Sequence, residues 1–103
     1  MIEINETSVK DVVKQIFNNK RVDYLIFSWF DEHNCESDDR DGYAEDAESA
    51  ICKQFNIAKE DVKCDFSLFG TTITVKCMYE GQKSKLVLTD KFGPRDYKVE
   101  ALS

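Results

Sequence analysis

The spacing of apolar residues predicts a helix near the start of the chain. The apolar positions recur at intervals of three and four, the period of one helix face: Val9, Val12, Val13, Ile16 and Phe17. Ser8 precedes them and Asp11 follows three residues later, which is a short-acid form of the capping box that marks a helix start. Together the two patterns predict a helix over residues 8–18.

The next apolar run, residues 24–30, carries aromatic and branched side chains at both odd and even positions. A short run of this composition predicts a strand that is buried on both sides near the centre of a sheet. Trp29 and Phe30 end the run directly beside a charged segment. Core burial is the usual fate of large aromatics in a small domain, and the alternative is that one of them forms the aromatic anchor of a binding surface.

A second helix is predicted over residues 43–55. Residues 31–42 have no apolar period and predict a loop, with Asp41 as the N-cap of the following helix. The apolar residues of that helix share one face: Tyr43, Ala47, Ala50, Ile51 and Phe55. Since the other face is polar, we expect this helix to lie on a sheet.

From residue 62 onward the apolar period changes to two. Strands are predicted over 62–69, 72–79, 83–90 and 97–102, as an antiparallel meander. With Gly70 and Thr71 as a two-residue turn, the first hairpin pairs Val62 with Tyr79, Cys64 with Cys77, Phe66 with Val75 and Leu68 with Ile73. The alternate positions are polar, so we expect helices on one face of the sheet only.

These elements predict an α+β fold. The chain of 103 residues, 42% of them hydrophobic, has the size of a single domain, residues 1–103. The predicted architecture is one mainly antiparallel sheet, which includes the strand near 24–30, with two helices packed on one face.

The four cysteines are expected to be reduced thiols. The sequence has no signal-peptide pattern and no apolar run long enough to span a bilayer, so we expect a cytoplasmic protein. Cys64 and Cys77, opposed in the predicted register, are either a redox pair or small apolar core residues. The second interpretation is preferred because a buried thiol reacts slowly.

The charge of the chain is concentrated in residues 31–48. This segment has nine acidic residues and one basic residue, a net charge of −8, whereas the whole chain carries −6. So many carboxylates must be solvated, and their field attracts cationic partners and repels nucleic acid. The segment is therefore either a solubilising loop or a binding surface for a basic partner.

Part of the same segment matches the spacing of an EF-hand loop, with Ser37, Asp39, Asp41, Gly42 and Glu48 at positions 1, 3, 5, 6 and 12. Position 1 is Ser instead of Asp, and a predicted strand precedes the loop where an EF-hand has a helix. We therefore predict no metal site, with a small calcium-binding module as an alternative.

Catalysis is not predicted. His33 is the only histidine, and its neighbours Glu32 and Cys35 come from the same loop, whereas a nucleophile and its base are brought together from different elements. The sequence also has no Gly-rich phosphate loop and no G-x-S-x-G motif. We expect no enzyme, no catalytic residues and no cofactor.

An acidic surface on a small domain of this kind suits an inhibitor that plugs a basic cleft. The chain resembles, in size, acidity and α+β build, the small acidic bacterial immunity proteins that neutralise toxin domains in contact-dependent growth inhibition. The resemblance is carried by the acids of 31–48 and the hairpin of 62–79, without a family motif, so no partner residues are carried over. It implies an antitoxin that is monomeric on its own and forms a heterodimer with a basic toxin domain, such as a nuclease. It also implies that the chain binds neither nucleic acid nor membrane.

The partner-binding residues predicted from charge and aromatic character are Trp29, Phe30, Asp31, Glu32, Glu36, Asp38, Asp39, Asp41, Tyr43, Glu45 and Asp46. The second function to consider is a nucleic-acid-mimicking inhibitor, such as a phage anti-defence protein. Such a mimic needs carboxylates spread over a large face with the spacing of phosphates, and here they occupy one loop and one helix edge.

Overall fold

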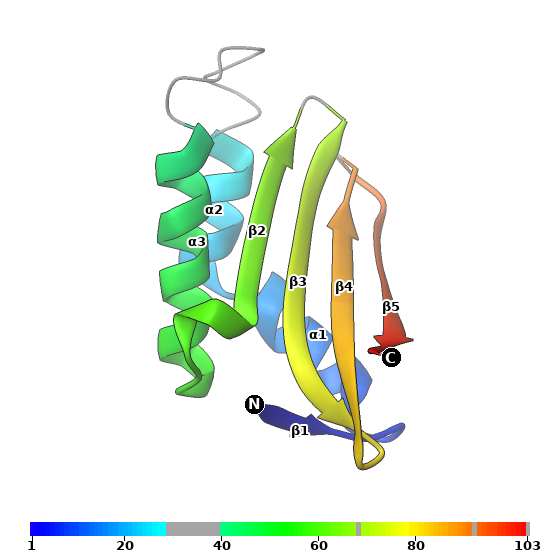
Figure 1. The fold of residues 1–103 in the computed structure, drawn as a ribbon. Coiled ribbons are helices and arrows are strands. Elements are labelled where there is room, and N and C mark those ends of the chain that lie inside the picture. The colour runs from blue at the N-terminus through cyan, green and yellow to red at the C-terminus, as the bar shows by residue number, and fades with distance from the viewer. Residues whose placement is uncertain (29–39, 68, 92, 103) are drawn as a thin grey trace.

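The C-terminal part of the chain forms an antiparallel meander (Figure 1). The structure, a computed structural model, describes residues 1–28, 40–67, 69–91 and 93–102, and of residues 40 and 41 only the backbone. The meander consists of β2 (Val62–Ser67), β3 (Gly70–Tyr79), β4 (Gln82–Asp90) and β5 (Arg95–Ala101). The predicted meander is confirmed, with strand ends that differ by a few residues.

A short strand that was not predicted completes the sheet. β1 (Ile2–Ile4) pairs in parallel with the end of β3, with Ile2 opposite Cys77 and Ile4 opposite Tyr79. Both β1 and β2 lie along the same side of β3, and β4 and β5 follow on its other side. The sheet is therefore five-stranded and mixed, although mostly antiparallel.

The predicted register of the first hairpin is wrong by four residues. Cys64 lies opposite Ile73, and Phe66 lies opposite Thr71. Gly70 is the first residue of β3 instead of a turn residue, because the end of β4 passes very close to it. Its φ is +131°, and a Cβ there would collide with the Asp90 carbonyl oxygen. Because the register is shifted by an even number of residues, each described side chain stays on its predicted face of the sheet. Leu68, which was predicted to pair with Ile73, lies outside the described residues.

The first predicted helix is confirmed as α1 (Val9–Phe17), but its cap lies one turn earlier than expected. Asn5 Oδ1 accepts hydrogen bonds from the backbone N–H groups of Thr7 and Ser8, at 3.0 and 2.8 Å. Ser8 Oγ in turn accepts the N–H of Asn5 at 3.0 Å. This reciprocal pair replaces the predicted capping box of Ser8 and Asp11.

The predicted strand near 24–30 is wrong over residues 24–28, which belong to helix α2 (Lys20–Ser28). Asn19 Oδ1 caps this helix by accepting the N–H groups of Arg21 and Val22, at 3.0 and 3.2 Å. The buried residues Val22, Leu25 and Ile26 have helical spacing, whereas Tyr24 and Phe27 are 58% and 66% exposed. Aromatic content suggested a buried strand, but the two aromatic rings lie on the outer side of a helix.

The second predicted helix is confirmed as α3 (Arg40–Phe55), which begins before residue 43. Asp41 is therefore inside the helix, and its prediction as N-cap is wrong. A single 3-10 turn, η2 (Lys59–Asp61), leads into β2. None of the helices in the described ranges is long and apolar enough to cross a membrane.

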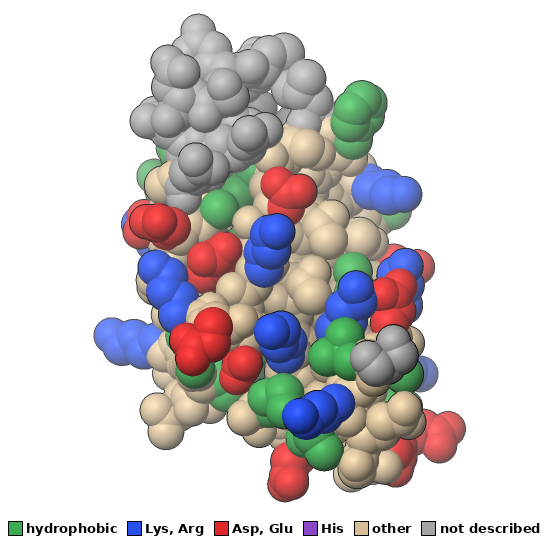
Figure 2. Space-filling view, viewed as in Figure 1, with side chains coloured by type: hydrophobic (Ala, Val, Ile, Leu, Met, Phe, Trp, Pro, Cys, Tyr) green, Lys and Arg blue, Asp and Glu red, His purple; other side chains and the backbone are tan. Residues whose placement is uncertain are grey.

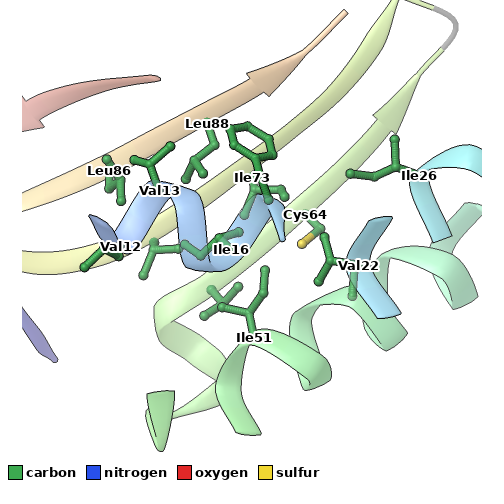
Figure 3. Close-up of a cluster of buried hydrophobic side chains, with 14 of the residues drawn as sticks. Val12, Val13, Ile16, Val22, Ile26, Ile51, Cys64, Ile73, Leu86 and Leu88 are labelled. Atoms are coloured by element: carbon green, nitrogen blue, oxygen red, sulfur yellow. The ribbon is translucent and has the colours of Figure 1, made fainter. Parts of the chain in front are cut away.

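In the described residues, three helices instead of the predicted two cover one face of the sheet. Figure 3 shows side chains from α1, α2 and α3 converging on β2, β3 and β4. Ile16, Val22 and Ile51 each have no exposed surface, and they pack in one cluster with Phe66 and Leu86. The opposite face carries lysines and threonines, as predicted, and Figure 2 shows lysine side chains spread over it.

Arg95 ties the helices to the end of the sheet. Its Nε donates to Asp90 Oδ2 at 2.9 Å, and its Nη2 donates to Asp23 Oδ1 on α2 at 2.6 Å. The guanidinium carbon lies 4.9 Å from the centre of the Phe17 ring on α1. The Asp90 side chain is only 6% exposed, so Arg95 compensates a carboxylate that is otherwise costly to bury.

The close approach of β4 predicts that Gly70→Ala is strongly destabilising. Both the positive φ and the collision with the Asp90 carbonyl oppose a side chain, so we expect the free energy of unfolding to fall by more than about 2 kcal/mol. Gly81→Ala is the matched control, because Gly81 has φ +80° but open space around it. Its expected cost is about 1 kcal/mol. Urea unfolding measures both, and equal losses would show that the collision does not matter.

Candidate functional site

The structure describes four of the predicted partner-binding positions. Asp41, Tyr43, Glu45 and Asp46 lie in the first turns of α3, and of Asp41 only the backbone is described. The other seven lie outside the described residues: Trp29, Phe30, Asp31, Glu32, Glu36, Asp38 and Asp39.

Tyr43 is partly buried against the core instead of standing free on the surface. Its ring centre lies 6.4 Å from that of Phe66, and the two ring planes meet at 76°, an edge-to-face arrangement. Phe66 is fully buried and Tyr43 is half-buried. Tyr43 therefore joins α3 to β2 and offers only part of its ring to a partner.

Glu45 and Asp46 are exposed, as predicted. Asp46 Oδ2 accepts a hydrogen bond from Arg21 Nη2 on α2 at 3.2 Å. Both side chains of this ion pair are more than half exposed, so it contributes little to stability and is available for exchange with a partner. The guanidinium carbon of Arg21 also lies 5.7 Å from the centre of the Tyr24 ring.

A shallow open depression runs between α2 and α3. Its lining consists of Arg21, Tyr24, Leu25, Gly42, Tyr43, Glu45 and Asp46. Phe27 does not line this depression, but it is exposed on α2 three residues after Tyr24. We call these eight residues the α2–α3 surface. Comparisons of the chain with family models, curated proteins and solved structures found no match.

Sequence reasoning missed the α2 half of this surface, namely Arg21, Tyr24 and Phe27. The missed signal was the spacing of Val22, Leu25 and Ile26 behind a good N-cap, Asn19. The acidic segment and the α2–α3 surface are nevertheless linked by the chain itself, since residues 29–39 connect the end of α2 to the start of α3. Phe27 and Tyr43 flank this connection in sequence.

The described part of the calcium-loop pattern does not have calcium-loop geometry. Asp41 and Gly42 are helical, whereas the glycine at position 6 of an EF-hand makes a sharp turn. Glu48, at the position of the bidentate ligand, instead accepts the backbone N–H of Cys64 at 2.9 Å. In the described ranges no three His, Cys, Asp or Glu side chains gather as a metal site would require. Glu32, His33 and Cys35 lie outside those ranges.

The expected juxtaposition of Cys64 and Cys77 is wrong. Cys64 lies opposite Ile73, which is four residues from Cys77 along β3, or about 13 Å. A disulfide cannot span that separation. Both thiols are free and buried, as small core residues would be. Burial, with a smaller contribution from the Glu48 carboxylate, raises the pKa of the Cys64 thiol to about 12.

These burials predict the order of thiol reactivity. In a Cys35→Ser variant, iodoacetamide at pH 8 should alkylate the half-buried Cys52 faster than Cys64 or Cys77, and all three should react alike in urea. The pKa of Cys64 is raised from 9.0, so its stabilising contribution is complete below about pH 9 and is lost as the pH rises toward 12. Cys64→Ala should remove this part of the pH dependence. Fast alkylation of native Cys64, followed by mass spectrometry, would contradict the assignment.

Proposed function

We propose that the chain is a protein-binding inhibitor, namely an immunity protein or antitoxin that neutralises a cationic toxin domain. The observation that carries the proposal is the exposure of Tyr24 and Phe27 on α2, where Tyr24 lines one depression with the carboxylates Glu45 and Asp46. Large exposed aromatics next to each other are unfavourable in water and are typical of interaction sites. The acidic segment of residues 31–48 adds a net charge of −8 beside them in the sequence.

The two kinds of residue support different steps of binding. Carboxylates at the rim of an interface speed the encounter with a basic partner and make it sensitive to salt. Aromatic side chains that lose their water at the centre of an interface slow dissociation. The α2–α3 surface has both, and the Arg21–Asp46 ion pair between its helices is weak enough to open when a cationic group approaches.

The partner that fits this chemistry is a basic protein, such as a nuclease whose cleft binds phosphates. Carboxylates of the inhibitor then occupy the places that phosphates take in the substrate. We propose that each chain binds one partner molecule, without nucleic acid, membrane or cofactor, and that it acts by binding and not as an enzyme. The free thiols of Cys52, Cys64 and Cys77 support a reducing, cytoplasmic location.

Growth rescue tests the function. The chain is produced in bacteria together with the toxin candidate encoded by the neighbouring gene, and cell growth is followed. We expect the chain to restore growth and to bind the toxin with a stoichiometry of one toxin molecule for each chain. Continued toxicity despite full expression of the chain would contradict the proposal. Capture of a DNA-binding protein that is not toxic would favour a nucleic-acid mimic.

Neutralising the acidic segment should slow association. The variant Asp38→Asn, Asp39→Asn, Asp41→Asn should bind the toxin about tenfold more slowly at low salt, with a weaker dependence on salt. Its thermal stability should change little, because the removal of like charges is offset by the loss of the Asp41 carboxylate from the first turn of α3. The matched control Glu3→Gln, Glu60→Gln, Asp65→Asn changes the net charge equally at exposed positions elsewhere. Stopped-flow binding measures the rates, and equal rates for both triple variants would show that the segment only improves solubility.

The exposed aromatics of α2 should govern dissociation. Tyr24→Ala and Phe27→Ala should each raise the dissociation rate about tenfold or more, with little change in association or in stability. Phe69→Ala is the control, because Phe69 is 86% exposed but lies in the connection between β2 and β3. Surface plasmon resonance separates the two rates. Unchanged dissociation for both α2 variants would place the interface elsewhere.

A further inference from the structure

β5 is the open edge of the sheet. It pairs with β4 on one side, and no described strand pairs with its other side. The N–H of Leu102 donates to the carbonyl oxygen of Lys83 at 2.9 Å. This bond shows that the backbone groups of the even-numbered residues of β5 face β4. In an antiparallel pair the backbone groups of alternate residues point to opposite sides, so those of Tyr97, Val99 and Ala101 point away from β4.

The opposite edge of the sheet differs from β5 because helix α3 lies beside β2 (Figure 1). On β2, the N–H of Cys64 is taken by Glu48 Oε2 of α3 at 2.9 Å. On β5 only one outward N–H is taken in this way, that of Tyr97, which donates to Asp96 Oδ1 at 2.8 Å. The N–H groups of Val99 and Ala101, and the carbonyl of Tyr97, are left available for another strand.

The sequence of β5 is complementary to itself. When two copies pair antiparallel about Val99, each Val99 faces the other, and Lys98 of each copy faces Glu100 of the other. A pairing centred on Lys98 or on Glu100 would instead place like charges opposite each other, which is unfavourable. Lys98 and Glu100 lie on the polar face of the sheet, where the Glu100 carboxylate meets Lys98 at 2.7 Å and Lys85 of β4 at 3.3 Å within one chain.

The same register satisfies the open backbone groups. The N–H of Val99 in each copy reaches the Val99 carbonyl of the other, and the N–H of Ala101 reaches the Tyr97 carbonyl, while Asp96 keeps its bond to Tyr97. On the inner face, Tyr97 and Val99 are half-buried against the core and would lose more of their exposed surface. Backbone, charge and apolar contacts thus all support the register centred on Val99.

We propose that two copies of this chain associate through β5, antiparallel and centred on Val99, so that one continuous sheet crosses both copies. This inference does not depend on the proposed function. In Figure 1, β5 lies at the side of the molecule opposite α2 and α3, so the α2–α3 surface stays free in each copy. A complex with toxin would then contain two chains and two partners, in place of the single heterodimer expected from the sequence.

A charge exchange tests the pairing and its register together. Sedimentation equilibrium of the purified chain should show a monomer–dimer equilibrium. Lys98→Glu and Glu100→Lys should each raise the dimer dissociation constant about tenfold or more, because two attractive pairs become repulsive by symmetry. The double variant Lys98→Glu, Glu100→Lys should return to within about threefold of the wild type. Lys76→Glu, an equal charge change on the exposed face of β3, should have no effect.

A backbone variant guards against effects on folding. Val99→Pro removes an N–H that points away from β4, so the ladder to β4 is retained and circular dichroism should remain native. We expect this variant to be monomeric. The proposal is overturned if the wild type stays monomeric up to about millimolar concentration, if the double charge variant associates no better than the single ones, or if folded Val99→Pro associates like the wild type.

Discussion

The fold depends on the burial of one apolar face of the sheet. Phe66, Leu86 and Leu88 on that face have no exposed surface, whereas the alternate positions of the same strands are polar apart from Val87. Each fully buried side chain of this size contributes about 1.5–3 kcal/mol relative to an exposed one, so the face cannot be left uncovered. Ile16 and Ile51, from α1 and α3, supply two of the covering contacts. Because the cover is one-sided, the outer faces of α2, α3 and the sheet remain available to partners.

This constraint explains which elements sequence reasoning found. The helix α1 and the strand β2 are buried on one side only, so their apolar residues recur with a clear period. β1 has three residues, too few for any period. The hairpin register was missed because Gly70 was interpreted as a turn residue, when its lack of a side chain serves the approach of Asp90. That requirement comes from a strand twenty residues away and is invisible in local sequence.

The candidate site was predictable in charge but not in shape. Glu45 and Asp46 follow from counting acids, and both are exposed. Tyr24 and Phe27 were assigned to a buried strand because aromatic residues are usually buried. A core position for them conflicts with the helical spacing of Val22, Leu25 and Ile26, which leaves the rings outside. In α2, the aromatic content suggested a buried strand, whereas the spacing of the apolar residues was that of a helix with one buried face. A conflict of this kind between composition and spacing indicates exposed aromatic residues, and so a binding surface.

The distribution of charge gives the proposed inhibitor a direction of approach. Outside residues 31–48 the chain carries a net charge of +2, and lysines are spread over the outer face of the sheet (Figure 2). Within the described ranges, Lys63, Lys76 and Lys83 have no carboxylate within 4 Å, so their charges are not neutralised locally. A basic partner is therefore repelled from the sheet face while the acidic segment attracts it. Because the two fields act on the same approaching molecule, they narrow the orientations of encounter, which is the step that limits protein association rates.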